Sequence, residues 1–398
     1  MSDTQRADVV VVGGGVIGLT VAWRARQAGM SVVVLERDTV GAATSRVAAG
    51  MLAPVSEVEF GESGRRALGL GLRSAAMWPV FASELEVASG LSVGLRASGT
   101  LLVARDSDDA RELERQLQLR SSLGLAVRRL RASQARELEP ALAPTVRLAI
   151  EAPGDHSVDP RLVLAALERA CSSAGVELRA HAPVTRVELD ADRSRVAGVA
   201  FADGELVAGD RVVLAAGPWS EQVEGLGAGA RVHVRPVKGQ TLRLRDPAGP
   251  GLLERVLRFR GGYLVPRADG AYVLGATVEE RGFELAPTAG GMYELLRHAY
   301  ELVPGITELH IEELSVGLRP GTPDNAPVIG PGEIDGLVWA TGHYRNGILL
   351  APLTAEFVVG LFTGGEPDPL LELCAPGRFA VAESGGANEP SPTAETVA

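Results

Sequence analysis

A glycine-rich turn near the start of the chain has the residue types and spacing that bind a phosphate group. The turn follows an apolar run, Val9 to Val12, and reads GGGVIG over residues 13–18. In such a turn, Gly13 permits the sharp bend, Gly15 lets the backbone approach a pyrophosphate, and Gly18 lets the next helix lie close to its strand. The pyrophosphate then lies at a helix N-terminus, where unpaired N–H groups favour an anion.

An acidic residue completes the pattern of a dinucleotide-binding βαβ unit. Glu36 ends a strand predicted over 31–35 and follows the turn by about 20 residues, the spacing at which a carboxylate binds ribose hydroxyls. An acid at this position argues against a 2′-phosphate. The helix between them is predicted over 16–28 and stops at Gly29. The motif by itself does not choose between NAD and FAD.

A second glycine-rich loop, TGHYRNGI over 341–348, leads into the last predicted helix at 351–362. Its position mirrors that of the first turn, so a second helix N-terminus is expected to face the same ligand. Reduced flavin carries negative charge near its pyrimidine ring, which a helix N-terminus stabilises, whereas NAD has no such group. This loop therefore favours FAD.

Composition limits the class of protein. The chain has 398 residues, above the usual ceiling of about 250–300 for one core, so two domains are expected. A net charge of −11 without a basic face predicts no nucleic-acid partner. No signal peptide is visible and no apolar stretch reaches the roughly 18 residues of a membrane span, so we expect a cytoplasmic protein with no membrane partner.

The cysteines of the chain indicate neither a metal site nor a disulfide. Cys171 and Cys374 are the two cysteines, and their wide separation predicts neither a disulfide framework nor a zinc site, so no metal is expected. Lys238 is the single lysine among many arginines, which we interpret as coding bias rather than function.

The remaining elements alternate between helices and strands. Helices are predicted at 64–90, 108–122, 160–174, 288–302 and 351–362, and strands at 98–105, 176–180, 184–189, 196–201, 211–215, 241–244, 263–266, 272–274, 311–318, 328–330 and 337–340. Apolar and polar residues alternate over 232–319, which indicates an antiparallel sheet built around a pocket.

These elements predict an α/β fold with two domains. A discontinuous Rossmann-like FAD-binding domain takes 1–90, 145–228 and 325–376, and a substrate-binding domain takes 91–144 and 229–324. The second is an α+β domain on a mostly antiparallel sheet. Residues 377–398 are small, polar and proline-containing, and are predicted to form a disordered tail.

Seven stretches together resemble the FAD-dependent D-amino-acid oxidase superfamily, and most closely the glycine oxidases of thiamine-thiazole biosynthesis. They follow the family's order from end to end: the first turn, TSRVAAGML at 44–52, PVKGQ at 236–240, YLVPR at 263–267, GAT at 275–277, GLRPGTPD at 317–324 and GHYRNGILLAP at 342–352. The last two are specific to amine and amino-acid oxidases, and AAGML points to the glycine oxidases.

The resemblance implies a set of substrate-binding residues. In the family, the arginine matching Arg319 forks two N–H bonds onto the substrate carboxylate, which a planar guanidinium suits. Tyr263 matches a tyrosine that binds the same carboxylate, Arg345 an arginine of the flavin loop, and Met51 a residue over the flavin. Each also has a structural interpretation: an ion pair for Arg319, core packing for Tyr263 and Met51, and a solvated loop position for Arg345.

The resemblance also implies noncovalent FAD. Val184 matches the position whose backbone meets the adenine. The predicted cofactor-binding residues are Gly13, Gly15, Val16, Ile17, Gly18, Glu36 and Arg37, then Thr44, Ser45, Ala49, Gly50 and Met51, then Val184 and Gly217, and finally Gly342, His343, Tyr344, Arg345, Asn346, Gly347, Ile348 and Leu349.

The implied activity is oxidative deamination of glycine, sarcosine or small D-amino acids. Hydride passes to flavin and then electrons to O2, which gives an imino acid or 2-oxo acid, ammonia and hydrogen peroxide. No side chain is expected as acid or base, because orientation of a neutral amine suffices. For glycine, glyoxylate or its imine would serve thiazole synthesis. The family further implies a homo-oligomer.

Three alternatives stay open at this point. A D-amino-acid dehydrogenase would pass electrons to a quinone or carrier, and a sarcosine oxidase would commonly tether flavin through a cysteine. A flavoprotein module without turnover is disfavoured by the presence of Tyr263 and Arg319. Gly261 stands where related glycine oxidases can carry a histidine, which leaves the shape of the pocket entrance open.

Overall fold

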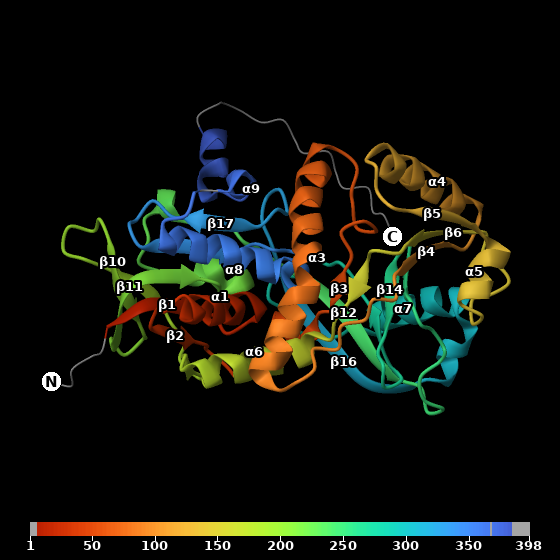
Figure 1. Ribbon diagram of the computed structural model, residues 1–398, viewed down its shortest axis with the longest axis horizontal. Coiled ribbons are helices and arrows are strands. Elements are labelled where there is room, and N and C mark those ends of the chain that lie inside the picture. Colours follow the sequence, from red (N-terminus) through yellow and green to blue (C-terminus); the bar gives the residue numbers. More distant parts are fainter. Residues whose placement is uncertain (1–5, 367, 384–398) are drawn as a thin grey trace.

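The computed structural model describes residues 6–366 and 368–383. They form two mixed eight-stranded sheets and one two-stranded sheet. In Figure 1 the two large sheets lie in opposite halves of the molecule, and the long helix α3 (Glu62–Ser89) stands between them. The predicted fold class, α/β with a second and largely antiparallel sheet, is confirmed.

The first sheet has a parallel centre in the order β18-β11-β1-β2-β8. These strands are β1 (Ala7–Val12), β2 (Val32–Leu35), β8 (Glu177–Arg179), β11 (Leu206–Leu214) and β18 (Leu337–Thr341). Antiparallel strands extend it: β17 (Val328–Pro331) beside β18, then β10 (Val196–Ala200) and β9 (Arg186–Leu189) beyond β11. Every residue of β2 is buried, as expected for a parallel strand covered on both faces.

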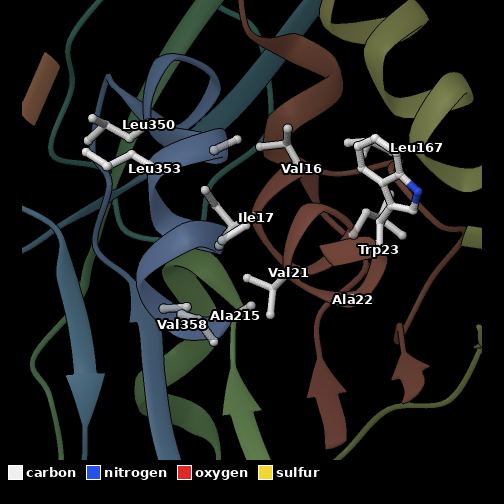
Figure 2. Close-up of a cluster of buried hydrophobic side chains, with 14 of the residues drawn as sticks. Val16, Ile17, Val21, Ala22, Trp23, Leu167, Ala215, Leu350, Leu353 and Val358 are labelled. Carbon is white, nitrogen blue, oxygen red and sulfur yellow. The ribbon is translucent and has the colours of Figure 1, made fainter. Parts of the chain in front are cut away.

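Three helices cover one face of this sheet: α1 (Val16–Gln27), α6 (Pro160–Ala174) and α8 (Gly347–Thr363). Figure 2 shows α1 between the other two, with Ile17 and Val21 toward α8 and Trp23 toward Leu167 of α6. Each buried aliphatic side chain of this size contributes about 1.5–3 kcal/mol. The packing therefore fixes the N-termini of α1 and α8 against the same sheet.

The second sheet has the order β16-β12-β15-β14-β13-β4-β6-β5, antiparallel except between β13 and β4. Its strands are β4 (Thr100–Ala104), β5 (Arg128–Arg131), β6 (Leu148–Ala152), β12 (Arg235–Arg245), β13 (Val256–Phe259), β14 (Gly262–Pro266), β15 (Ala271–Gly275) and β16 (His310–Gly321). Helix α7 (Ala289–Leu302) packs on one face through Leu295 and Leu302. The other face carries the candidate site.

The remaining elements are short or lie at the margins. They are α2 (Thr44–Val47), β3 (Met51–Leu52), β7 (His156–Ser157), α4 (Ser107–Ser122), α5 (Ala132–Leu138), α9 (Pro369–Glu372) and the 3-10 turns η1 (Gly217–Gln222), η2 (Ala228–Ala230), η3 (Pro304–Glu308) and η4 (Pro376–Glu383). Within the described ranges, no helix combines the length and apolar character that a membrane crossing requires.

Some observed elements differ from the sequence predictions. Strand β6 pairs with β4 and belongs to the second sheet, although it follows the boundary predicted at residue 145; the domain division stays a prediction. Strands β5 and β13 were not predicted, since arginines interrupt their apolar pattern; β5 reads RRLR with one buried side chain.

Two more corrections concern the C-terminal part of the chain. Helix α8 begins at Gly347, a turn earlier than predicted, and Pro352 lies inside it rather than in its first turn. The tail predicted from Gly377 starts instead as the 3-10 turn η4, and Phe379 packs against the core of the first sheet. Residues 384–398 of that prediction lie outside the described residues.

Candidate active site

The glycine turn after β1 has no room for side chains. Gly13 has φ +110°, and a Cβ there would lie 2.5 Å from the carbonyl oxygen of Ala215. A Cβ on Gly18 would lie 1.9 Å from the carbonyl oxygen of Gly13, so α1 packs directly on the turn. Gly15 is the N-cap of α1 and supplies no capping side chain. The positive end of α1 is therefore available to an anionic ligand.

Glu36 is held at the end of β2 beside this turn. Its Oε2 accepts a hydrogen bond from the backbone N–H of Gly14 at 2.7 Å, and its Oε1 accepts one from Asp38 at 3.0 Å. Each carboxylate oxygen keeps a further acceptor position for a hydroxyl donor. The next residue, Arg37, stacks on Trp219 of η1, with Cζ 3.7 Å from the ring centre. Sequence reasoning did not single out Trp219.

The second glycine loop brings another helix N-terminus to the site. Gly342 has φ +73°, and His343 is 3% exposed, with Nε2 2.9 Å from Thr354 Oγ1. Burial lowers the pKa of His343 to about 3, so its imidazole is neutral at physiological pH. The N-cap of α8, Asn346, makes no side-chain capping bond. This N-terminus therefore also suits negative charge on a ligand.

The carboxylate-binding candidates lie on one face of the second sheet. The register pairs Tyr263 of β14 with Arg258 of β13 on one side and with Gly275 of β15 on the other. A Cβ on Gly275 would lie 2.7 Å from the Tyr263 hydroxyl, and one on Gly239 of β12 would lie 2.5 Å from Nη1 of Arg319. These two glycines therefore make the space in which the Tyr263 and Arg319 side chains lie.

Arg319 has hydrogen bonds but no counter-ion among the described residues. Its Nη1 donates to the carbonyl oxygen of Thr277 at 3.0 Å and, more weakly, to that of Lys238 at 3.4 Å. Among the residues that the structure describes, no carboxylate lies within ion-pair distance of Arg319 or Arg345. Desolvation lowers the pKa of Arg319 from its ordinary value. A positive charge held without a partner in this way is costly, which favours binding of an anion.

Two further pKa shifts fit an anion site. Burial raises the pKa of Tyr263, which keeps its hydroxyl protonated as a donor. Burial of Arg345 opposes its charge, but Tyr344 and the carboxylates of Glu57 and Glu59 raise its pKa overall. Tyr263 and Met51 also pack against the same small apolar cluster.

An ion pair that sequence reasoning overlooked lies in the wall of the site. Arg258 pairs with Glu57, which follows β3, and both side chains are largely buried. The backbone just before Glu57 is fixed by two buried residues. Asp155 accepts the N–H groups of Val55 and Ser56 at 3.0 and 2.6 Å, and Arg120 donates to their carbonyl oxygens at 2.9 and 2.7 Å.

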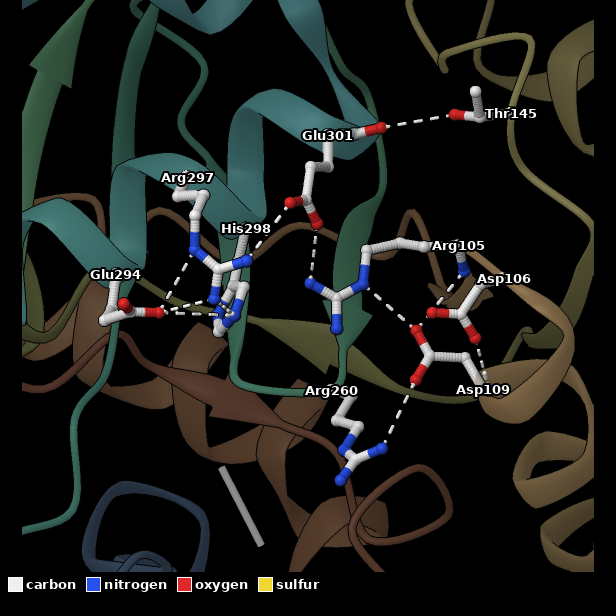
Figure 3. A network of polar contacts seen from close by, with 9 residues as sticks. All are labelled: Arg105, Asp106, Asp109, Thr145, Arg260, Glu294, Arg297, His298 and Glu301. Carbon is white, nitrogen blue, oxygen red and sulfur yellow. Dashed lines mark hydrogen bonds and ion pairs between the residues drawn. The ribbon is translucent and has the colours of Figure 1, made fainter.

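His298 lies where a side chain at position 261 would otherwise lie, and both residues line the cavity. Gly261 has φ +91°, and a Cβ there would lie 2.4 Å from Nδ1 of His298. Figure 3 shows the ion-pair network that joins this turn to α4 and α7. Asp109 is 3.0 Å from Arg105 and 3.9 Å from Arg260. The space beside Gly261 is thus occupied by a residue of α7.

One cavity of about 1810 Å³ joins the glycine turn to the carboxylate-binding candidates. All four predicted substrate residues line it: Met51, Tyr263, Arg319 and Arg345. So do most predicted cofactor residues, namely Gly13, Gly15, Val16, Ile17, Glu36, Arg37, Thr44, Ser45, Ala49, Gly50, Val184, Gly217, His343, Tyr344, Asn346, Gly347 and Ile348.

Three predicted cofactor residues do not line the cavity. Gly18 and Gly342 act through backbone packing, since their absent side chains leave space for Gly13 and Thr322. Leu349 is 3% exposed and faces the core, and its carbonyl oxygen accepts bonds from Ser74 at 2.6 Å and Trp78 at 2.9 Å.

The two glycine loops that line the cavity suit a dinucleotide that contains a flavin. The glycine turn and Glu36 fit a pyrophosphate and a ribose, and the N-terminus of α8 fits an electron-rich ring. An unpaired arginine near that ring fits an anionic reactant. In the described part of the chain, no group of His, Cys, Asp and Glu is arranged to hold a metal ion. A fold and site of this kind define a flavin-dependent oxidoreductase.

Comparison with known proteins places the chain in a family. The model of the FAD dependent oxidoreductase family matches residues 8–361, and the chain belongs to this family. It is 35% identical to a glycine oxidase of Geobacillus kaustophilus over 90% of this chain and 93% of that protein. A solved structure of glycine oxidase from Geobacillus kaustophilus has a TM-score of 0.87 at 34% identity, covering 94% of this chain and 99% of that chain.

A second relative is longer than this chain. The bifunctional protein ThiO/ThiG of Synechocystis sp. is 36% identical over 94% of this chain, which spans 54% of that protein's length. The family resemblance and the FAD requirement predicted from the sequence are confirmed by these matches.

Proposed function

We propose that this chain is an FAD-dependent oxidase of glycine and related small amines, including sarcosine and small D-amino acids. The observation that carries the proposal is Arg319, which lines the same cavity as the dinucleotide turn and has no counter-ion in the part of the chain that the structure describes. The relatives named glycine oxidase support glycine as the substrate. The relative named ThiO/ThiG supports a role in thiamine biosynthesis.

The carboxylate of the amino acid would bind at the sheet end of the cavity. Arg319 presents a planar fork of donors that matches a carboxylate, and lysine would not offer this geometry. The protonated Tyr263 hydroxyl supplies a further donor. Arg345 contributes positive charge and Met51 contributes apolar surface to the same cavity. These residues would orient the α-carbon of the substrate.

FAD would occupy the other end, held noncovalently. The residues proposed to bind it are the lining residues of the two glycine loops and of segments 44–51, 184 and 217, with Gly18, Gly342 and Leu349 supporting the loops from behind. Cys171 and Cys374 are buried and do not line the cavity, which supports a cofactor without a thioether link. The first sheet would thus serve the cofactor and the second the substrate.

The chain's contribution to the reaction is orientation. FAD held by the two glycine loops would supply the hydride acceptor for this reaction. Arg319 and Tyr263 fix the carboxylate, and the Cα–H bond breaks as the lone pair of a neutral amine forms the C=N bond, so no side-chain acid or base is required. Hydrolysis of the imine would give a 2-oxo acid and ammonia, with O2 as the final electron acceptor and hydrogen peroxide as its product. A cytoplasmic location and assembly as a homo-oligomer stay predictions.

Anaerobic mixing of the yellow protein with glycine, sarcosine, D-alanine and D-proline tests the proposal. Loss of flavin absorbance near 450 nm, recovered on admitting air with formation of peroxide, is the expected result. Reduction that persists in air would favour a dehydrogenase with another acceptor. Failure of all four compounds to reduce the flavin would contradict the proposal.

A further inference from the structure

The chain's single lysine is fully buried, although coding bias alone gives no reason for burial. Lys238 lies on β12 between Val237 and Gly239, is 0% exposed, and points away from the cavity face of the sheet. Its Nζ donates to the carbonyl oxygen of Ala286 at 2.7 Å and lies 3.4 Å from Glu284 Oε1. A buried ammonium is retained only when it is well paired.

These partners belong to one exposed segment, residues 276–288, which we call the strap. The strap runs from the end of β15 to the start of α7. Lys238 and Glu279 also exchange two backbone hydrogen bonds, at 2.9 and 3.0 Å. Gln240 adds a bond from Nε2 to Glu279 Oε1 at 2.6 Å and accepts the N–H of Thr288 at 2.7 Å. The strap is therefore fastened to β12 by two buried side chains.

The strap also contacts the cavity through its first three residues. Ala276, Thr277 and Val278 line it, and the Thr277 carbonyl oxygen accepts the 3.0 Å bond from Nη1 of Arg319. Farther along the strap, Phe283 packs on Trp219, with ring centres 6.0 Å apart. The strap thus connects the guanidinium proposed to bind the carboxylate with the aromatic ring beside Arg37.

We propose that Lys238 is a positioning residue, whose ammonium fastens the strap in the arrangement that orients Arg319 for a carboxylate. The inference rests on the proposed carboxylate site and adds the element that controls it. A guanidinium binds a carboxylate most strongly through two hydrogen bonds when it is already oriented for both. The carbonyl oxygen of Thr277 holds the Arg319 guanidinium in that orientation. If the strap loosens, Arg319 loses this acceptor and carboxylate affinity falls.

Thermodynamic linkage predicts that carboxylate binding changes how often the strap is released, which can be measured. If fastening of the strap favours carboxylate binding, carboxylate binding must favour fastening by the same factor. A released strap exposes the Lys238 amine, whereas a fastened strap buries it. Because Lys238 is the chain's single lysine, acetylation of that side chain by an N-hydroxysuccinimide ester reports on the strap without any turnover.

The first experiment measures the acetylation rate of Lys238 in the FAD-loaded protein by peptide mass analysis. The probe is acetate at a concentration that saturates its effect on the flavin spectrum, and acetamide is the neutral control of the same size. We expect acetate to slow acetylation about fivefold or more, within the range of typical coupling free energies, and acetamide to leave the rate unchanged. An acetate-independent rate, or no acetylation in either condition, would overturn the inference.

The outcomes also separate this inference from the proposed function. Acetate that perturbs the flavin without protecting Lys238 would leave the carboxylate site in place and reject the link to the strap. Acetate that neither perturbs the flavin nor competes with glycine would reject the carboxylate site itself, and the inference with it.

Variants give a second readout. Lys238→Met removes the ammonium at similar length, and we expect KM for glycine and the acetate Kd to rise about tenfold, a change of about 1.4 kcal/mol, with kcat within about twofold. Lys238→Arg restores donors and should recover part of the affinity. Glu139→Gln is the control, because Glu139 is a buried anchor of residues 254–255 elsewhere in the same sheet. It should lower Tm without changing the acetate Kd; a parallel rise of Kd in both variants would contradict a specific role for Lys238.

Discussion

At both ends of the cavity, glycines make room for another group. The two ends differ in how far that group lies from the glycine along the chain. At the dinucleotide end, Gly13 and Gly18 leave out side chains so that a turn and a helix can touch. At the carboxylate end, Gly239 and Gly275 leave out side chains so that Arg319 and Tyr263 can lie across neighbouring strands. The first contacts join residues within one turn, apart from Ala215, whereas the second join residues on different strands, consecutive ones for Gly275 and Tyr263 and widely separated ones for Gly239 and Arg319.

This difference explains which functional contacts can be predicted from the sequence. In the glycine turn, each glycine serves a neighbour in the same motif, so spacing reveals the role. In the second sheet, the glycine and the side chain that needs its space lie in different motifs, and only strand pairing brings them together. Variants at the two ends should therefore fail in different ways.

The largest effect is expected from Gly18→Ala. Its Cβ would lie 1.9 Å from a backbone oxygen that cannot move without distorting the turn. We expect loss of FAD binding and destabilisation of about 3 kcal/mol or more, measured by flavin content and urea unfolding. The control is Gly360→Ala in α8, where no atom lies within 4 Å of the new Cβ; helix propensity should stabilise that variant by up to about 1 kcal/mol. Equal flavin content in both variants would contradict the steric argument.

Gly239→Ala should impair binding of the substrate carboxylate and leave FAD binding intact. The new Cβ would lie 2.5 Å from Nη1 of Arg319 and displace the guanidinium. We expect kcat/KM for glycine to fall about 100-fold, or about 2.7 kcal/mol, with flavin content retained. Gly154→Ala, where the new Cβ meets nothing within 4 Å, is the control. Unchanged kinetics in Gly239→Ala would show that Arg319 does not need this space.

The sequence predicted the fold class and most of the elements because their signals are local. The βαβ unit, the Asp159 cap with Pro160, and the Gly175 stop each act within a few residues. The four residues that motif resemblance predicts to bind substrate all line the cavity. The sequence did not predict the Glu57–Arg258 pair, the Arg120–Asp155 anchor or the role of Lys238, because each depends on contacts between distant segments.

The next prediction concerns how the free energy of unfolding depends on pH through His343, at the flavin end of the cavity. The folded-state pKa of His343 is lowered to about 3 from 6.5, so below pH 6.5 the unfolded chain takes up a proton that the folded chain excludes. Stability is therefore lost as pH falls from 6.5 toward 3, by about 1.5 kcal/mol between pH 6.5 and 5. Urea unfolding of His343→Asn should show a shallower pH dependence by this amount. Identical slopes for the two proteins would contradict a buried, neutral imidazole.

Glu57→Gln should have the smallest effect. It tests whether the charge of Glu57 weakens binding at the carboxylate end of the cavity. The Glu57 carboxylate opposes an incoming carboxylate near Arg345 and Tyr263, although Arg258 partly neutralises it. We expect KM for glycine to fall about threefold at low salt and the difference to shrink at high salt. Glu84→Gln, which removes a surface ion pair with Arg24, is the control and should leave KM unchanged. A rise in KM for Glu57→Gln would reverse the assigned sign.

The most direct test of the account is an acetate titration of the flavin spectrum in the wild-type protein and in Arg319→Met. The account places FAD and the carboxylate in adjoining parts of one cavity, with Arg319 binding only the carboxylate. It predicts that the variant keeps its flavin and loses acetate affinity by about 100-fold or more, the scale expected for removing a desolvated charge partner. An unchanged acetate Kd in Arg319→Met would contradict it.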